Sequence, residues 1–395
     1  MFDFPKYKLY EIIIDKVIDE FTEQQDKFVF NNIQEAKGYQ FRSFRESQTL
    51  QKKIRKCIFP GCTSLCIKKS HTIQRACLQT ISESQHLLTP GTKEGKTIIV
   101  PIGINDASTF PGFCQVHEEV FKEFEKSKKF DTDKSFYLQI LRTICREIVI
   151  MESQISGFQR TKTNYTQFRN LQLTRRCKEL LGPIISPALK NINIECDNWR
   201  LKAIENIINE FSSQLKQLKK LYRKLYSDIK STKSSKFCIE PIDLNWVVPV
   251  ALAGMTGLTI KRSKSCREII LFMNIIPFEN KTLVILGGES KNKGLIQKYK
   301  ETFCNPLAAI NIIERWMVYG SDHWFIRPSV WDKIPNERQK LILKGISKED
   351  KCIFDDLSLS IFDDLRKELI TLAKSNTEFY QENRDFVLNE ERKLV

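Results

Sequence analysis

Two short segments of the chain concentrate cysteine and histidine. The segment KCIFPGCTSLCIKKSHTIQRAC (56–77) holds four cysteines and a histidine, and FPGFCQVHEEVF (110–121) holds one of each. Zinc takes four tetrahedral thiolate or imidazole ligands, supplied as two close pairs from separate turns. Each segment carries one such pair next to a Pro-Gly turn. We therefore predict one structural zinc site with the ligands Cys57, Cys62, Cys114 and His117.

Three further residues are near enough in sequence to replace one of these ligands: Cys66, His71 and Cys77. Cys66 and Cys77 also suit a buried position, since a free cysteine packs like a small apolar side chain. A simpler interpretation is that all of these cysteines are buried independently and bind no metal. In a reducing compartment that interpretation leaves five clustered thiols unexplained.

A cysteine pair, then SHTIQR (70–75), then a second pair resembles the HNH, or ββα-metal, nucleases that carry a structural zinc. The resemblance implies that His71 is the general base that activates water. It also implies that Glu118 fills the position of the family's metal-binding histidine. A catalytic Mg²⁺ or Mn²⁺ would there stabilise the charge that develops on the scissile phosphate.

The resemblance covers about 60 residues. It departs from the family at two positions and in the gap between the two halves, which is long for the family. Ser70 stands where many members have an acid or a histidine, and Asn105 is the nearest candidate for the family's middle asparagine. The alternative is a treble-clef-like zinc scaffold without a catalytic metal, in which His71 is a ligand or a buried hydrogen-bonding residue. The phrases SHTIQR and FPGFCQVHE also resemble a set of uncharacterised bacterial proteins. This second resemblance implies no activity, although such zinc proteins are often suspected in anti-phage defence.

The charge balance points to a polyanionic partner. The chain has 63 lysines and arginines against 48 acids, a net charge of +15. Such an excess favours nucleic acid, although a merely basic soluble surface would give the same count. The stretch 37–56 mixes basic and aromatic residues, which suits either a phosphate-tracking segment or a solvated helix face.

We expect a cytoplasmic protein with no membrane segment. The first residues lack the basic, apolar and small-residue pattern of a signal peptide. Seven of the twelve cysteines are scattered singly, as thiols in a reducing compartment are. The longest apolar run has 15 residues and is too short to span a bilayer.

The elements that would position these residues fall into three regions of a mixed α+β chain. We predict a zinc-binding HNH-like domain at 1–130, which opens with an amphipathic helix over 10–21. A coiled-coil-like helical hairpin follows at 131–235 and an α+β domain of unassigned role at 236–395. In the middle region apolar residues at 137–158 and 204–229 repeat with alternating spacings of three and four, as in a coiled-coil seam.

A proline-containing segment separates the two helices, which can fold back on each other or pair with a second subunit. We expect a homodimer or other homo-oligomer. The second helix carries a basic ridge, for which a solubilising face is the simpler explanation. In the C-terminal region 266–276 and 281–288 predict a β-hairpin, and 305–320 predicts a helix with Pro306 in its first turn.

Two functions from different classes follow. The first is metal-dependent cleavage of DNA or RNA, with His71 and Glu118 as the catalytic residues. The second is a zinc-stabilised module that binds nucleic acid or assembles through the coiled coil and does not cut. Dependence of activity on Mg²⁺ or Mn²⁺ separates them, whereas salt dependence does not, because both would bind phosphates.

Overall fold

The computed structural model describes Ile12, 15–17, 19–20, Gln34 and residues 49–394, without 94–95, 128–129, 131, 182–198, 232–235, 263–264 and 349–350. These residues form a mixed α+β fold, as predicted. Most of the expected helix at 10–21 and the first part of the basic stretch at 37–56 lie outside them. The chain groups into two units, Met1–Lys53 with Ile150–Gln217 and Ile54–Val149 with Leu218–Val395, which we describe separately.

The first unit is built on two long helices, α7 (Asp133–Leu181) and α8 (Trp199–Lys230), each of which also contributes residues to the second unit. Phe158 of α7 meets Phe211 of α8, with ring centroids 5.8 Å apart, and one turn further Lys162 pairs with Glu205 at 2.6 Å. The residue number rises along α7 while it falls along α8 from one contact to the next, so the two helices form an antiparallel hairpin. The supercoil itself and the oligomer stay predictions.

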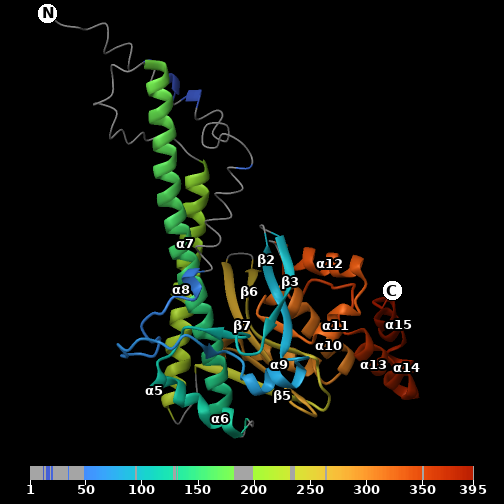
Figure 1. The fold of residues 1–395 in the computed structure, drawn as a ribbon. Coiled ribbons are helices and arrows are strands. Elements are labelled where there is room, and N and C mark those ends of the chain that lie inside the picture. The colour runs from blue at the N-terminus through green and yellow to red at the C-terminus, as the bar shows by residue number, and fades with distance from the viewer. Residues whose placement is uncertain are drawn as a thin grey trace, which may run out of the picture. The chain divides into compact units, whose positions relative to one another are not determined.

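The second unit contains a seven-stranded antiparallel sheet in the order β3-β2-β9-β6-β7-β8-β5 (Figure 1). Its strands are β2 (His86–Lys93), β3 (Lys96–Gly103), β5 (Phe237–Leu244), β6 (Val250–Arg262), β7 (Ser265–Pro277), β8 (Thr282–Glu289) and β9 (Trp324–Ile326). The predicted hairpin is confirmed, since β7 pairs with β8. β2 and β3 come from the predicted region 1–130 and the other strands from 236–395, so both regions contribute to one sheet.

Both faces of the inner strand β7 are buried over residues 271–277, which are apolar except for Asn274. Leu271, Met273 and Ile275 point into one large core. Phe272 and Asn274 point to the opposite face, and α7 packs there: Gln139 and Thr143 of α7 both donate to Asn274 Oδ1, at 3.1 and 2.7 Å.

Helices cover the face that carries the large core (Figure 1). They are α9 (Lys293–Thr302), α10 (Pro306–Arg315), α11 (Pro328–Asp332), α12 (Asn336–Ile346), α13 (Asp363–Ser375), α14 (Thr377–Glu382) and α15 (Arg384–Arg392), with the short turns η4 (Ser290–Asn292) and η5 (Trp316–Gly320). The start of α10 agrees with the prediction: Asn305 caps the helix by accepting from Leu307 and Ala308, and Pro306 fills the first turn.

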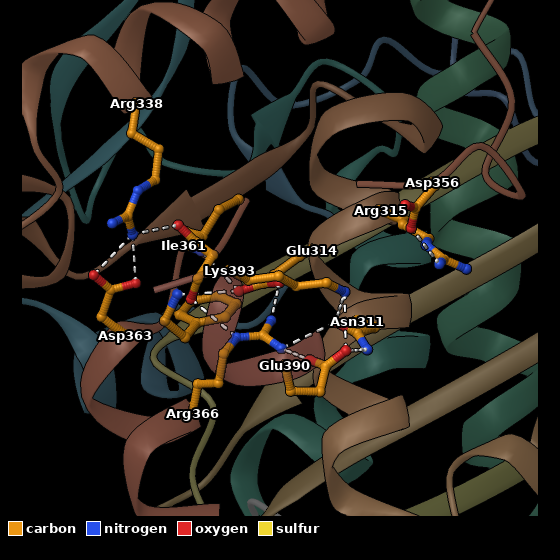
Figure 2. A network of polar contacts seen from close by, with 12 residues as sticks. Asn311, Glu314, Arg315, Arg338, Asp356, Ile361, Asp363, Arg366, Glu390 and Lys393 are labelled. Carbon is orange, nitrogen blue, oxygen red and sulfur yellow. Dashed lines mark hydrogen bonds and ion pairs between the residues drawn. The ribbon is translucent and has the colours of Figure 1, made fainter. Parts of the chain in front are cut away.

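A buried network of charges ties α10, α13 and α15 together (Figure 2). Arg366 of α13 is fully buried and pairs with Glu314 of α10 and Glu390 of α15. Its remaining donors bind Asn311 Oδ1 and Ser360 Oγ, each at 3.0 Å. Because every partner of the arginine is itself held by the fold, the three helices are fixed in one arrangement.

The network is balanced in charge. Glu390 also pairs with Lys393 at 3.0 Å, and Glu314 accepts the backbone N–H groups of Ile361 and Phe362 at 2.7 and 3.1 Å. Two carboxylates therefore face two cations, Arg366 and Lys393. Removal of Arg366 would leave two buried carboxylates with one cation, Lys393, which costs much more than the intact network contributes.

We expect Arg366→Met to lower the free energy of unfolding of this unit by about 3–5 kcal/mol, because it leaves the buried Glu314 without a cation and Glu390 with Lys393 alone. Urea denaturation followed by tryptophan fluorescence measures the change. The matched control is Lys367→Met, which alters the exposed neighbour on the same helix and should stay within about 0.5 kcal/mol of the parent. Equal effects of the two substitutions would contradict the prediction.

Candidate metal centre

The four predicted ligands converge in the second unit. The ligand atoms of Cys57, Cys62, Cys114 and His117 all lie within 4.8 Å of one another. Sγ of Cys62 and Cys114 are 3.8 Å apart, and His117 Nδ1 lies 3.4 and 3.2 Å from the sulfurs of Cys57 and Cys114. A tetrahedral zinc with bonds of about 2.0–2.3 Å has ligand separations of roughly 3.5–3.8 Å. The cluster could therefore hold a metal ion, and its donors are those of a structural zinc.

A tight turn aims the first pair of ligands. Cys57 N–H donates to Ser64 O at 2.8 Å and Cys62 N–H donates to Phe59 O at 3.1 Å. Gly61 has a φ of 77°, in the left-handed region where a side chain would be strained. The glycine of the Pro-Gly turn thus permits the reversal that points both sulfurs inward.

The second pair is set at the start of the short helix α5 (Gln115–Glu118), for which Cys114 is the N-cap residue. The loop before it joins the first turn through two backbone hydrogen bonds, Ile58 N–H to Gly112 O at 3.0 Å and Ile67 N–H to Phe113 O at 2.7 Å. These two hydrogen bonds join the two halves of the cluster.

Helix α8 packs directly on this turn. Tyr222 Oη donates to Ile58 O at 3.2 Å, and the Phe59 ring lies edge-on to Tyr226, with centroids 5.3 Å apart. The Phe59 ring also stacks on the His117 imidazole, with centroids 4.1 Å apart and planes 12° from parallel.

Burial raises the pKa of the Cys57 thiol to about 11. A metal must therefore displace a tightly held proton there, and metal affinity should fall as the pH is lowered.

The other candidate ligands lie outside this cluster. Cys66 is buried and its sulfur accepts the Arg55 N–H at 3.3 Å. Cys77 is buried in α4 (Arg75–Ile81), where its thiol donates to Gln74 Oε1 at 3.6 Å. Both positions suit the packing role weighed from the sequence.

His71 lies on a two-residue strand, β1 (Ser70–His71), which pairs with β4 (Thr109–Phe110). Its Nε2 atom is buried and has no hydrogen-bond partner among the described residues. Burial, together with the positive charge of Arg142, lowers the pKa of His71 to about 4. The imidazole is therefore neutral at pH 7 and keeps a lone pair that can accept a proton.

Glu118 ends α5, directly after the ligand His117. Its Oε1 accepts from Arg142 at 3.0 Å, whereas its Oε2 is buried and has no hydrogen-bond partner in the described structure. The Ser70 hydroxyl accepts the N–H of Phe113, which precedes the ligand Cys114, at 3.2 Å. Burial raises the pKa of Glu118, against the opposing effect of Arg142. The loop before α5 and the strand that bears His71 are thus linked through Ser70.

Arg142 was not expected from the sequence. It belongs to α7, is fully buried, and also pairs with Glu125, in α6 (Lys122–Ser127), at 2.6 Å. Its guanidinium lies over the Phe121 ring, 4.4 Å from the centroid. Phe121 ends the 3₁₀ turn η1 (Glu119–Phe121), which follows α5. An arginine within a periodic helix pattern gives no local signal of this role.

A second unexpected set of contacts holds the residues that follow His71. Ser108 accepts the Thr72 N–H on its carbonyl and the Ile73 N–H on its hydroxyl, both at 2.8 Å. The same hydroxyl lies 3.2 Å from Nε2 of the buried His323. Gln139 of α7 donates to Thr72 O at 2.9 Å. Groups from three distant parts of the sequence therefore fix the backbone next to His71.

Comparison with protein families, curated proteins and solved structures found no match to this chain. Among the described helices, none is long and apolar enough to cross a membrane. In the described part of the chain, the four-residue cluster is the one group of three or more His, Cys, Asp or Glu residues close enough to share an ion. His71 and Glu118 are not part of such a group.

We expect the purified protein to carry one zinc per chain. Cys57→Ser should lose that zinc, because a serine hydroxyl does not replace a thiolate ligand. Cys66→Ser is the matched control, a buried cysteine outside the cluster, and should retain it. Metal analysis by mass spectrometry measures the ratio, and full zinc content in Cys57→Ser would contradict the assignment.

Proposed function

We propose that this chain hydrolyses phosphodiester bonds of nucleic acid, with His71 as the general base. The observation that carries the proposal is the buried Nε2 atom of His71, which has no hydrogen-bond partner among the described residues and lies on a strand joined to the candidate zinc site. An antiparallel β1–β4 pair followed by α5 is also compatible with the ββα arrangement that the sequence resembles. The basic charge of the chain suits the substrate.

His71 would take a proton from water as the water attacks phosphorus, and its low pKa would keep it in the accepting form. The structural zinc would be held by Cys57, Cys62, Cys114 and His117 and would take no part in the reaction. A divalent cation, Mg²⁺ or Mn²⁺, would be held by Glu118 Oε2, with substrate phosphate and water as further ligands, as Mg²⁺ sites with few protein ligands are. When bound, it would neutralise charge on the scissile phosphate.

A second function is favoured by one specific observation. Arg142 already pairs with Glu118, and a cation beside a carboxylate competes with a metal ion. The second proposal is therefore a zinc-stabilised scaffold that binds nucleic acid or assembles into oligomers without cutting. In it, His71 is a buried residue with no catalytic role.

We expect His71→Ala to lower the rate of Mg²⁺- or Mn²⁺-dependent cleavage by about 10²–10⁴-fold, the usual contribution of a general base. Plasmid DNA, single-stranded DNA and RNA serve as substrates, with zinc content checked in each variant. His86→Ala, which alters an exposed histidine on β2, is the matched control and should cut as the parent does. Cleavage that survives His71→Ala would reject His71 as the base, and no cleavage by zinc-loaded parent protein would favour the scaffold.

The pH profile tests the state of His71 separately. With a pKa near 4, the base stays deprotonated as the pH falls, so kcat/KM should change little on its account between pH 7.5 and about 5.5. A histidine with the ordinary pKa of about 6.5 would lose roughly tenfold at pH 5.5. Initial rates with zinc content verified at each pH decide between the two.

A further inference from the structure

The C-terminal half of α8 presents a row of cations on its exposed side. Lys220, Arg223 and Lys230 are exposed and recur at spacings of three and seven residues, which keeps them on one face of the helix. The opposite face, with Leu221, Tyr222 and Leu225, is buried. We call the three exposed cations, Lys220, Arg223 and Lys230, the α8 stripe. At about 1.5 Å per residue it extends over roughly 15 Å.

The stripe is not neutralised by its surroundings. Neither Lys220 nor Arg223 has an ion pair with any described residue, and Lys230 lies over the Tyr226 ring at 4.6 Å. The one acid in this part of α8, Asp228, is buried and accepts the backbone N–H groups of Lys236 and Phe237 at 2.9 and 2.8 Å.

The side chains next to the stripe, Glu289 and Lys236, do not neutralise its charge. Glu289 of β8 is already paired with Lys224 and Lys291. A further lysine joins the row, because Lys236 Nζ donates to the Ser227 hydroxyl, which lies between Arg223 and Lys230, at 2.9 Å. A row of unpaired cations of this length matches several successive phosphates better than a single anion.

The stripe belongs to the same body as the candidate metal centre. Tyr222, next to Arg223, donates to the turn that holds the first ligand pair, and Tyr226, within one helical turn of Lys230, touches Phe59 of that turn. A strand of nucleic acid held by the stripe would therefore be bound on the helix that supports the metal centre.

We propose that the α8 stripe binds the phosphate backbone of nucleic acid. The proposal rests on the function proposed above in that it names where the substrate is held, and it applies equally to a protein that binds without cutting. Charge identifies the partner of the stripe. Several cations lie along one helix face, and the adjacent acids Asp228 and Glu289 already have partners within the fold.

The test measures binding by the full-length, zinc-loaded protein in the His71→Ala background, so that nothing is cut. Fluorescence anisotropy follows labelled single-stranded DNA, single-stranded RNA and duplex DNA over a range of KCl concentrations. The stripe variant is Lys220→Gln/Arg223→Gln/Lys230→Gln. The control is Lys298→Gln/Lys344→Gln/Lys367→Gln, which removes the same charge from exposed lysines on α9, α12 and α13.

For the stripe variant we expect weaker binding and a plot of log K against log salt that is less steep by about 2 for single strands or 3 for duplex DNA, as for three lost phosphate contacts. The control should keep nearly the full slope. Equal changes in both variants, or none, would overturn the proposal. The same variants are also tested with vesicles of anionic lipid. A stripe variant that loses affinity for these vesicles alone would likewise overturn the proposal. Loss of binding in the stripe variant, when the parent never cuts, would support the stripe and reject the nuclease.

Discussion

The ligand atoms of three cysteines and one histidine lie within 4.8 Å of one another, and they join the turn at 57–62 to the start of α5. Such thiols gain stability from one another only when a metal binds their deprotonated forms. The turn that carries Cys57 and Cys62 reaches the loop before α5 through backbone hydrogen bonds of Ile58 and Ile67. A metal would lock that junction and, with it, the short strand pair that bears His71, which has only two residues in each strand.

The remaining order near His71 comes from elsewhere in the same unit. Ser108, Gln139 and His323 bind the backbone just beyond it or support one another there, so the sheet and α7 act together with the metal centre. Arg142 gives Glu118 a counter-charge, which a catalytic cation would have to share. The α8 stripe adds a surface that suits a phosphate backbone under either function.

Local patterns in the sequence predict much of this structure. The paired Cys/His spacing and the Pro-Gly turns identify the four convergent residues, and unbroken β-branched runs identify the β7–β8 hairpin, because both are set by neighbours in the chain. The joining of β2 and β3 to β9 and β6 in one sheet is not visible in this way, since strand pairing over more than 200 residues leaves no local periodicity. Arg142 and His323 were missed as partners of the His71 region for the same reason: their roles exist only after distant elements pack.

Hydrogen exchange with and without bound zinc tests most directly whether the metal stabilises the junction between the two halves of the candidate site. If it does, the amides of Ile58, Ile67 and Phe113 exchange slowly in the zinc-loaded protein and quickly after zinc is removed. The β7–β8 hairpin, which has no contact with the four ligands in the described structure, should stay protected in both states and serves as the internal control. Unchanged protection of all three amides after complete zinc removal would contradict a metal-dependent junction. Loss of protection throughout the sheet would instead show that the metal supports the whole unit.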